Sequence, residues 1–275
     1  MKLKDSKICF IGAGNMASCI IGGLIKDGFP PAQIIASDLS ADNLKRLHDR
    51  FGIRVDSSNQ QAVASAGIVV LSVKPQVLKV VCEDIAGALS HRPMVISIAA
   101  GIELESINRW LGGDLPLVRC MPNTPAQVLK GASGLIANEH VSDRQKQAAT
   151  TLFSAIGITE WLETEQLMHA VTALSGSGPA YIFLVIEAME AAAVKLGVAP
   201  ETARKLAAQT VTGAAEMVLG SELEPAQLKR NVMSPGGTTE RAIQVFDQQG
   251  LAAIFEQAIN AAAERSETLS EQLKG

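Results

Sequence analysis

A glycine-rich turn close to the start of the chain has residue types suited to binding the pyrophosphate of a dinucleotide. The run Gly12-Ala13-Gly14-Asn15-Met16-Ala17 follows a short apolar segment and precedes a helical pattern. Gly12 allows a tight turn, Gly14 lets the main chain approach a phosphate, and the small Ala17 lets the helix pack close to the strand. Because the free N–H groups at the helix start would face the phosphates, this pattern predicts a dinucleotide site. The alternative interpretation is a strand-to-helix turn that binds nothing.

An acidic residue, Asp38, ends the strand predicted over 34–38 and bears on the choice of dinucleotide. A carboxylate at this position usually bonds the ribose hydroxyls of NAD and repels the extra phosphate of NADP. Lys45 and Arg46 follow on the next helix and could partly offset that repulsion. Asp38 could equally cap the helix predicted over 41–51. The sequence therefore leaves NAD and NADP both open.

Three further loops follow predicted strands, at the edge where a nucleotide-binding sheet collects its ligands. In Ser72-Val73-Lys74-Pro75, the lysine could reach a phosphate, and a solvated surface lysine is the alternative. Ala99-Ala100-Gly101 is small enough for a flat ring to lie against the main chain. Met121-Pro122-Asn123-Thr124-Pro125 is a stiff polar loop, which we expect to contact cofactor or substrate rather than to serve structure alone.

Two glycine-containing loops lie in the second half of the chain. Ser175-Gly176-Ser177-Gly178-Pro179-Ala180-Tyr181 is predicted to break one helix and start another. Ser234-Pro235-Gly236-Gly237-Thr238-Thr239 precedes the helix predicted over 239–249, so its backbone N–H groups lie at a helix N-terminus. Such a turn suits a carboxylate. Thr238 or Thr239 could instead cap the helix, and both interpretations can hold together.

The ionisable residues favour reduction of a carbon–nitrogen double bond over reduction of a ketone. No lysine lies between Lys146 and Lys195, so the helix after Gly178 lacks the general acid that a 3-hydroxy-acid dehydrogenase places there. An imine can be protonated before the hydride arrives, so the protein need only hold the two reactants face to face. The histidines lie outside the glycine loops, and His169, one helical turn after Glu165, is predicted to form an exposed pair with it.

Composition and charge exclude several classes of function. The formal net charge is −4 without a basic block, which gives no indication of nucleic-acid binding. Apolar runs such as 66–73 are too short to span a bilayer, and no apolar signal core precedes the first strand, so we expect a cytoplasmic protein without a membrane partner. The cysteines lack paired or zinc-type spacing, which predicts buried reduced thiols and no metal site; they are Cys9, Cys19, Cys82 and Cys120.

Eight strand patterns and a series of helices must position these loops. Strands are predicted over 7–11, 34–38, 53–55, 68–73, 94–98, 116–120, 133–137 and 158–162. Helices are predicted between them, and only helices follow. This order indicates an α/β, Rossmann-like doubly wound domain over 1–162 and an all-α domain over 163–275. Because the later helices carry alanine-rich faces that do not close a core alone, we expect the second domain to pair with a second copy.

Taken together, these motifs resemble those of the pyrroline-5-carboxylate reductase family. The resemblance rests on the first glycine turn, on Val73-Lys74-Pro75-Gln76, on the loop from Met121 to Pro125, and on the two glycine loops of the second half. Their order and spacing fit, and the resemblance covers essentially the whole chain. It implies an NAD(P)H-dependent oxidoreductase that transfers a hydride to the imine carbon of 1-pyrroline-5-carboxylate, giving L-proline in the last step of proline biosynthesis.

The resemblance also implies roles for individual residues. Thr172 would be the catalytic partner of the imine nitrogen. The substrate, a small cyclic imino acid, would be bound by Glu222, Ser234, Gly236, Gly237, Thr238 and Thr239. NADP or NAD would be bound by Gly12, Ala13, Gly14, Asn15, Met16, Ala17, Ser37, Asp38, Asn59, Ser72, Val73, Lys74, Pro75, Ala99, Ala100, Gly101, Asn123 and, across a subunit interface, Asn231.

Similar proteins form homodimers through intertwined C-terminal helices, and the resemblance extends this to larger rings such as a decamer of five dimers. It favours NADP, although Asp38 departs from the serine or basic pocket of strict NADPH use. Two other functions are weighed against it. A 3-hydroxy-acid or 6-phosphogluconate-type dehydrogenase would share the architecture but needs the missing lysine. A non-catalytic module that senses a dinucleotide would leave the polar glycine loops of the second half without a purpose.

Overall fold

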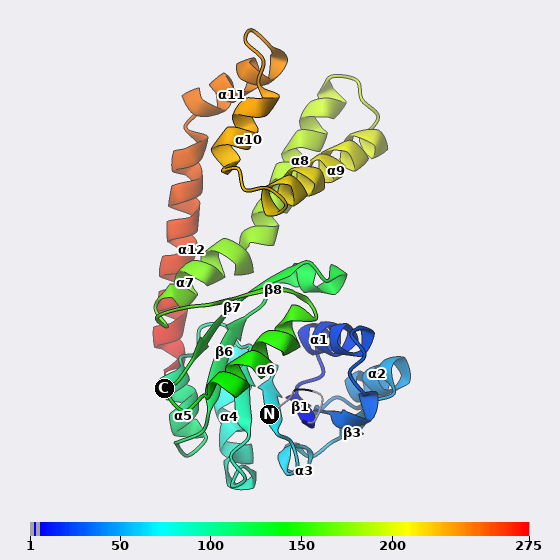
Figure 1. Ribbon diagram of the computed structural model, residues 1–275, viewed down its shortest axis with the longest axis vertical. Helices are drawn as coiled ribbons and strands as arrows, with labels where there is room; N and C mark the ends of the chain where they lie inside the picture. The colour runs from blue at the N-terminus through cyan, green and yellow to red at the C-terminus, as the bar shows by residue number, and fades with distance from the viewer. Residues whose placement is uncertain (1–2, 4–5, 275) are drawn as a thin grey trace. The chain divides into compact units, whose positions relative to one another are not determined.

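A mostly parallel β-sheet covered by helices on both faces forms the first part of the molecule (Figure 1). The computed structural model describes residue 3 and residues 6–274. The strands are β1 (Ile8–Ile11), β2 (Ile34–Ser37), β3 (Arg54–Asp56), β4 (Ile68–Leu71), β5 (Met94–Ser97), β6 (Leu117–Met121), β7 (Gly131–Ala137) and β8 (Gly157–Trp161). Every strand predicted from the sequence is present.

The strands lie in the order β3-β2-β1-β4-β5-β6-β7-β8. Strands β1 to β6 are parallel, β7 is antiparallel to β6, and β8 is parallel to β7. The chain therefore reverses its direction of winding between β1 and β4. In an open α/β sheet this switch point, at the carboxyl ends of the strands, is where a ligand crevice forms. The predicted doubly wound fold is confirmed.

Helices bury one apolar side each against the two faces of the sheet. One face is covered by α1 (Asn15–Lys26), α2 (Ala41–Phe51) and α6 (Asp143–Ser154), and the other by α3 (Asn59–Val63), α4 (Pro75–Ile85) and α5 (Leu104–Trp110). Short helical turns are η2 (Pro31–Gln33), η3 (Ala86–Ala88) and η4 (Thr124–Val128). The central strands are buried on both faces, as the continuous Ile-Val-Val-Leu run of β4 requires.

The chain divides into two compact units. Unit 1 comprises residues 1–177 and 261–275, and unit 2 comprises residues 178–260. Unit 1 contains the sheet, α7 (Leu167–Val171), the π-helical turn η5 (Thr172–Gly176) and the end of α12 (Leu251–Leu273). Unit 2 contains α8 (Gly178–Lys195), α9 (Pro200–Leu219), α10 (Pro225–Val232), α11 (Thr238–Gln248) and the start of α12, and within it α8 packs against α9.

These units differ from the sequence-based division at residue 163 for a packing reason. Strands do end at Trp161, but α7 then packs on β7. Gly134 of β7 makes room for it, since a methyl group there would lie 2.7 Å from Val171 Cγ1. The last turns of α12 also return to unit 1. Packing therefore places α7, η5 and the end of α12 in the same unit as the sheet. The strand pattern alone assigns these helices to the second domain.

The predicted helix break over Ser175–Tyr181 is much shorter in the structure and is confined to Ser177. The chain stays helical from Leu167 to Lys195 except at Ser177, because η5 widens to π-helical geometry instead of unwinding. This stretch is long and apolar enough to cross a membrane by length and mean hydropathy, which is 1.3, and little of it is buried. The sequence-based expectation that the apolar runs are too short to span a bilayer did not include this stretch, because Gly176 and Gly178 interrupt its apolar pattern.

Candidate active site

The first glycine turn is closed by the loop that follows β4. Gly12 has a φ of +98°, and a methyl group on it would lie 2.5 Å from the carbonyl oxygen of Ser72, so only glycine fits. Ser72 Oγ lies 2.9 Å from the oxygen of Ile11 and 2.8 Å from that of Gly12. Gly14 has no atom within 4 Å of its missing side chain, which leaves the start of α1 open to a ligand. The turn has the shape that a pyrophosphate needs.

Asp38 binds the glycine turn itself. Its Oδ2 accepts a hydrogen bond from the N–H of Ala13 at 2.7 Å, and its Oδ1 accepts one from the N–H of Ser40 at 2.7 Å. Ser40, not Asp38, caps α2, because its side chain accepts from the N–H of Asn43. The capping alternative for Asp38 is therefore wrong. The side chain of Asp38 therefore helps to shape the glycine turn, and its negative charge lies beside the proposed phosphate site.

Ser37 and Asn59 meet at the end of β2. Ser37 Oγ donates to Asn59 Oδ1 at 2.8 Å, and Asn59 Nδ2 donates to Asp84 Oδ2 at 3.1 Å. Asn59 lies at the start of α3, directly after β3, so the register of β2 with β3 brings the two residues together. Both residues were expected to line the adenosine pocket, and the structure places them at one point on the carboxyl edge of the sheet.

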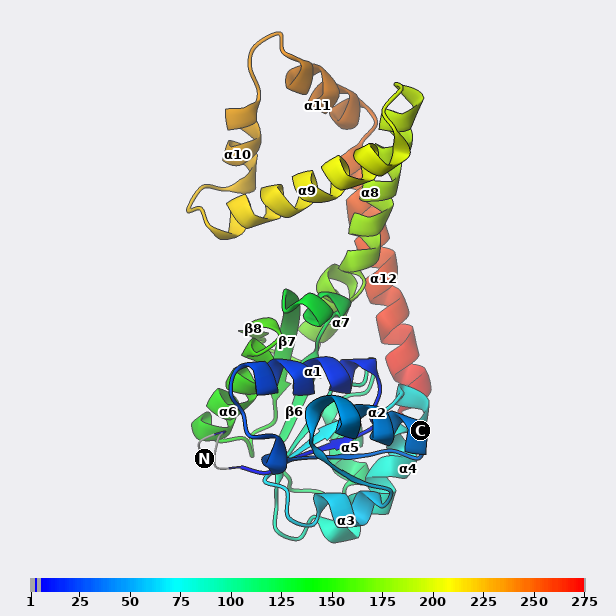
Figure 2. The same ribbon diagram turned by 90° about the vertical axis from the view of Figure 1, so that its right-hand side faces the viewer.

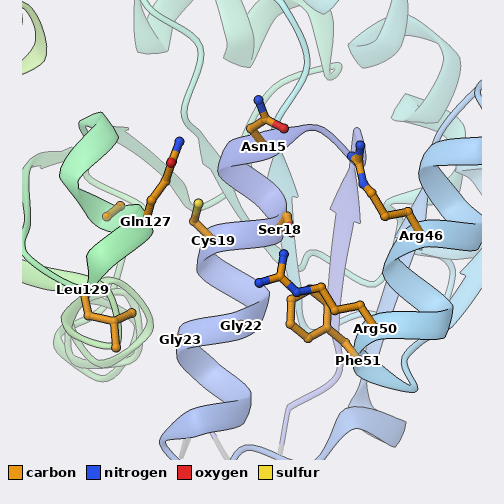
Figure 3. A pocket seen from close by; sticks show the side chains of 11 residues that line it. Asn15, Ser18, Cys19, Gly22, Gly23, Arg46, Arg50, Phe51, Gln127 and Leu129 are labelled. Carbon is orange, nitrogen blue, oxygen red and sulfur yellow. The ribbon is translucent and has the colours of Figure 1, made fainter.

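A basic groove of about 560 Å³ begins at the N-terminus of α1 (Figure 3). It runs between α1, α2 and η4, and its described lining contains no carboxylate. Arg46 Nη2 donates to the carbonyl oxygen of Ala13 at 3.1 Å, and Arg50 lies one helical turn further along α2, over the ring of Phe51. Arg46 thus places positive charge on the glycine turn opposite Asp38, which offsets the repulsion between that carboxylate and a phosphate.

Two more predicted loops lie at the same edge of the sheet. Lys74 is exposed at the N-terminus of α4, with Pro75 in the first helical turn, and Val73 packs against the core. Ala99, Ala100 and Gly101 follow β5, which pairs with β4. Because β1, β4 and β5 are neighbours and parallel, the three loops that follow them lie in one row along the sheet edge: the glycine turn, the Ser72–Pro75 loop and the Ala99–Gly101 loop.

Thr172 lies at the first position of η5 and is half-buried. Its hydroxyl donates to the carbonyl oxygen of Met168 at 2.7 Å, so the oxygen keeps lone pairs that can accept a hydrogen bond. A π-helical turn inside a helix frequently marks a functional site. The turn packs closely on β6, since a methyl group on Gly176 would lie 2.7 Å from Met121 Cε.

Asn123 connects this turn to the sheet. Its Nδ2 donates to the carbonyl oxygen of Ser175 at 3.0 Å, and its Oδ1 accepts from the N–H of Ala132 at 2.9 Å. The side chain is buried, so both ends of the amide serve the main chain. This geometry favours a role for Asn123 in positioning η5 over direct contact with cofactor or substrate.

In unit 2, the loop before α11 presents main-chain N–H groups at a helix N-terminus. Gly237 is the N-cap of α11 and no side chain caps the helix, so the capping alternative for Thr238 or Thr239 is wrong. The N–H of Gly237 donates to the carbonyl oxygen of Ser234 at 2.9 Å, which closes the turn. The N–H of Gly236 donates to Glu240 Oε2 at 2.7 Å. One N–H group of this turn therefore already binds a side-chain carboxylate.

The other predicted residues of unit 2 are exposed. Glu222 lies in the connection between α9 and α10, and Asn231 lies on α10, where its Oδ1 accepts from Gln227 Nε2 at 2.8 Å. Within the described residues no group of histidine, cysteine or acidic side chains is arranged to hold a metal. Burial raises the pKa of Cys9 and of Cys82 to about 12, and burial also raises that of Cys120.

The sequence and the fold match those of known proteins. A family model described as pyrroline-5-carboxylate reductase dimerisation matches residues 165–269, and one described as NADP oxidoreductase, coenzyme F420-dependent, matches residues 7–101. A pyrroline-5-carboxylate reductase of Pseudomonas aeruginosa is 54% identical over 98% of this chain and 99% of its own length. This chain belongs to the pyrroline-5-carboxylate reductase family.

Solved structures agree with this membership. The pyrroline-5-carboxylate reductase of Coxiella burnetii superposes with a TM-score of 0.94 and 45% identity, over 96% of this chain and 98% of that one. The pyrroline carboxylate reductase of Plasmodium falciparum, solved with NADP bound, has a TM-score of 0.86 and 30% identity, over 97% and 99%. The predicted family, the NAD(P)H-dependent oxidoreductase class and the cofactor class are confirmed.

Arg119 and Glu165 form an ion pair that the sequence motifs did not predict. Arg119 lies in β6 and is 1% exposed, with Nη1 3.0 Å from Glu165 Oε1 and no hydrogen-bond partner for Nη2. The same oxygen of Glu165 accepts the N–H of Leu104, the first residue of α5. An arginine inside an otherwise apolar strand was the signal for this buried ion pair.

Proposed function

We propose that this chain reduces 1-pyrroline-5-carboxylate to L-proline, with the cofactor on the loops at the carboxyl edge of the sheet and the substrate carboxylate on the Ser234–Thr239 turn. NADPH or NADH, when bound, supplies the hydride. The glycine turn, the open start of α1 and Arg46 fit a dinucleotide phosphate. The turn before α11 fits the substrate carboxylate, since a carboxylate already bonds one of its N–H groups.

The observation that carries this proposal is the hydrogen bonding of Thr172. Its proton is directed to the oxygen of Met168, so its oxygen can accept a hydrogen bond from a protonated imine nitrogen. The positive charge on that nitrogen makes the adjacent carbon electrophilic before reduction. No oxyanion forms, so the protein needs orientation more than a strong acid. Thr172 would hold the ring with this carbon toward the loop of Ala99–Gly101.

The test is a comparison of NADPH and NADH with the cyclic imine as substrate. We expect loss of the reduced nicotinamide absorbance with formation of an equal amount of proline, and NADPH as the better donor. A chain that binds either dinucleotide but yields no proline would contradict the proposal. Turnover of 3-hydroxy acids with the oxidised cofactor would favour the dehydrogenase alternative instead.

We also propose that unit 2 forms a homodimer, which brings Asn231 of the partner subunit to the cofactor, and that five such dimers assemble into a decamer in the cytoplasm. The match to a dimerisation family over 165–269 supports the pairing. So do the large exposed apolar side chains of α8 and α9, among them Phe183, Leu184 and Leu206. The molar mass of the purified protein in solution tests both levels of assembly.

A further inference from the structure

The last turns of α12 contact two segments of unit 1 that bear on the proposed reaction. Residues 261–273 of this helix belong to unit 1, and their end lies beside α5 (Figure 2). The buried residues of α12 are Ser266 and Ser270, one helical turn apart, with exposed fractions of 6% and 2%. Because serine is small, the helix backbone can approach its neighbours closely at both points.

Ser270 lies against the loop of Ala99–Gly101. A methyl group on Gly101 would lie 3.7 Å from the nitrogen of Ser270 and 3.7 Å from Leu273 Cδ1. Ser270 Oγ donates to Glu103 Oε1 at 3.2 Å, and Lys274 Nζ lies 3.0 Å from the same oxygen. Glu103 is the N-cap residue of α5, two residues after the loop. The helix therefore holds the loop where it enters α5.

Ser266 contacts the turn that precedes Thr172. His169 Nδ1 lies 2.9 Å from Ser266 Oγ, and both side chains are buried. The exposed pair predicted for His169 and Glu165 is therefore wrong, because Glu165 binds Arg119 instead. His169 follows Met168, whose carbonyl oxygen accepts the hydroxyl of Thr172. Ser266 thus fixes the helical turn that orients the proposed partner of the imine nitrogen.

We propose that the end of α12 sets the spacing between Thr172 and the Ala99–Gly101 loop, against which the nicotinamide ring would lie, with Ser266 and Ser270 as positioning residues. This inference rests on the proposed function, which assigns those two segments their roles. The hydroxyl of each serine contacts a buried or half-buried neighbour, His169 or Glu103, and would act through it. Hydride transfer needs the two reactants in near-attack geometry, and a displacement of about 1 Å can cost roughly a hundredfold in rate.

The test uses the full chain with Ser266→Ala, Ser270→Ala and both together. Thr268→Ala is the matched control, because Thr268 lies exposed on the same turns and bonds only Glu264 of its own helix. For each serine variant we expect kcat to fall by about ten- to a hundredfold, with KM for imine and cofactor within about twofold. The primary isotope effect with 4-deuterated NADPH should rise, because hydride transfer becomes slower than product release.

A second readout does not depend on turnover. Amide hydrogen exchange should become faster over 98–104 in Ser270→Ala and over 168–176 in Ser266→Ala, and should stay at the wild-type rate in Thr268→Ala. If a serine variant does not fold, Lys274→Met is used instead. It removes the exposed ion pair between Lys274 and Glu103 and leaves both serines in place.

Wild-type values of kcat and exchange in the serine variants would overturn this inference, as would a rise in KM with kcat unchanged. A wild-type chain that does not reduce the imine would instead contradict the proposed function, and the exchange rates would still decide whether α12 holds the two segments. An active wild type with unaffected serine variants would contradict the positioning role alone.

Discussion

At the scale of single residues, Asp38 combines a structural role with a role in cofactor choice. Its two oxygens bond the N–H groups of Ala13 and Ser40, so it shapes the glycine turn directly. Its charge also lies where the adenosine ribose is expected, with Arg46 on the opposite side of Ala13. A carboxylate and a guanidinium close to the same turn make the preference between NADH and NADPH a balance of two opposed charges.

Asp38→Asn should shift this balance toward NADPH. The amide oxygen can still accept the N–H of Ala13, while the hydrogen bond from the N–H of Ser40 is lost and the negative charge near the extra phosphate is gone. We expect the ratio of kcat/KM for NADPH to that for NADH to rise by about tenfold, corresponding to about 1.4 kcal/mol. Asp49→Asn is the control, because Asp49 pairs with Lys45 on the exposed side of α2. An unchanged ratio would show that Asp38 does not face the phosphate.

Thr239→Ala should weaken binding of the imine. Thr239 lies in the first turn of α11, beside the N–H groups proposed to bind the substrate carboxylate. Loss of one hydrogen bond to a charged group costs about 1.5–3 kcal/mol, so KM should rise at least about tenfold while kcat changes little. Thr151→Ala, on the exposed side of α6, is the control. Equal KM values in the two variants would remove Thr239 from the site.

The cysteines should differ in reactivity with an aromatic disulfide reagent. The pKa of Cys9 and of Cys82 is raised to about 12 by burial, and burial also raises that of Cys120, so all three stay neutral thiols near pH 8. Cys19 is half-buried in the basic groove, and burial raises its pKa while Arg50 opposes the shift. We expect slow labelling of Cys19 alone in the folded protein and of all four cysteines after unfolding. Rapid labelling of a second thiol in the folded state would contradict this.

At the scale of elements, one buried ion pair joins three parts of unit 1. Glu165, just before α7, binds Arg119 of β6 and the N-terminus of α5. Arg119 has no second partner for Nη2 within the described residues, so its charge depends on Glu165 alone. A buried charge left without its partner is much more costly than an apolar side chain in the same place.

Glu165→Gln should lower the free energy of unfolding by about 3–5 kcal/mol. The double variant Arg119→Met with Glu165→Gln should recover most of this loss, because no charge is then left buried. Urea denaturation of both variants and of the wild type provides the measurement. If the double variant is no more stable than Glu165→Gln, the loss comes from the hydrogen bond to Leu104 rather than from the unpaired charge.

At the scale of the whole molecule, unit 2 exposes more apolar surface than a monomer normally does. Phe183, Leu184 and Leu206 have exposed fractions between 61% and 65%, and α8 belongs to the stretch Leu167–Lys195, whose mean hydropathy is 1.3. Monomeric proteins rarely leave such a surface in water. In the proposed homodimer, the same helices of a second copy would cover this surface.

Phe183→Asp and Leu206→Asp should each weaken the dimer, because a desolvated carboxylate would lie in its interface. We expect the monomer fraction in sedimentation equilibrium to rise at least about tenfold at low protein concentration, with loss of reductase activity. Val80→Asp is the control, because Val80 is exposed to a similar degree on α4 of unit 1. Equal dissociation in all three variants would contradict an interface formed by α8 and α9.

Local pattern determined much of this protein. The apolar runs of β1 and β4, the glycines of the first turn and the loops after the strands follow from residue type and spacing, since strand propensity and turn geometry depend on near neighbours. The same patterns indicated the family and the chemistry of the Ser234–Thr239 turn, whose uncapped helix start the structure contains.

Only the tertiary structure decided which long-range contacts complete the site. Asp38 could cap its own helix or bind the glycine turn, and the packing of β1 beside β2 selected the second. The contact of Asn123 with Ser175, the pairing of Arg119 with Glu165 and the contacts of Ser266 and Ser270 all join residues far apart in sequence. No periodicity or spacing encodes such contacts, because they depend on how whole elements pack against one another.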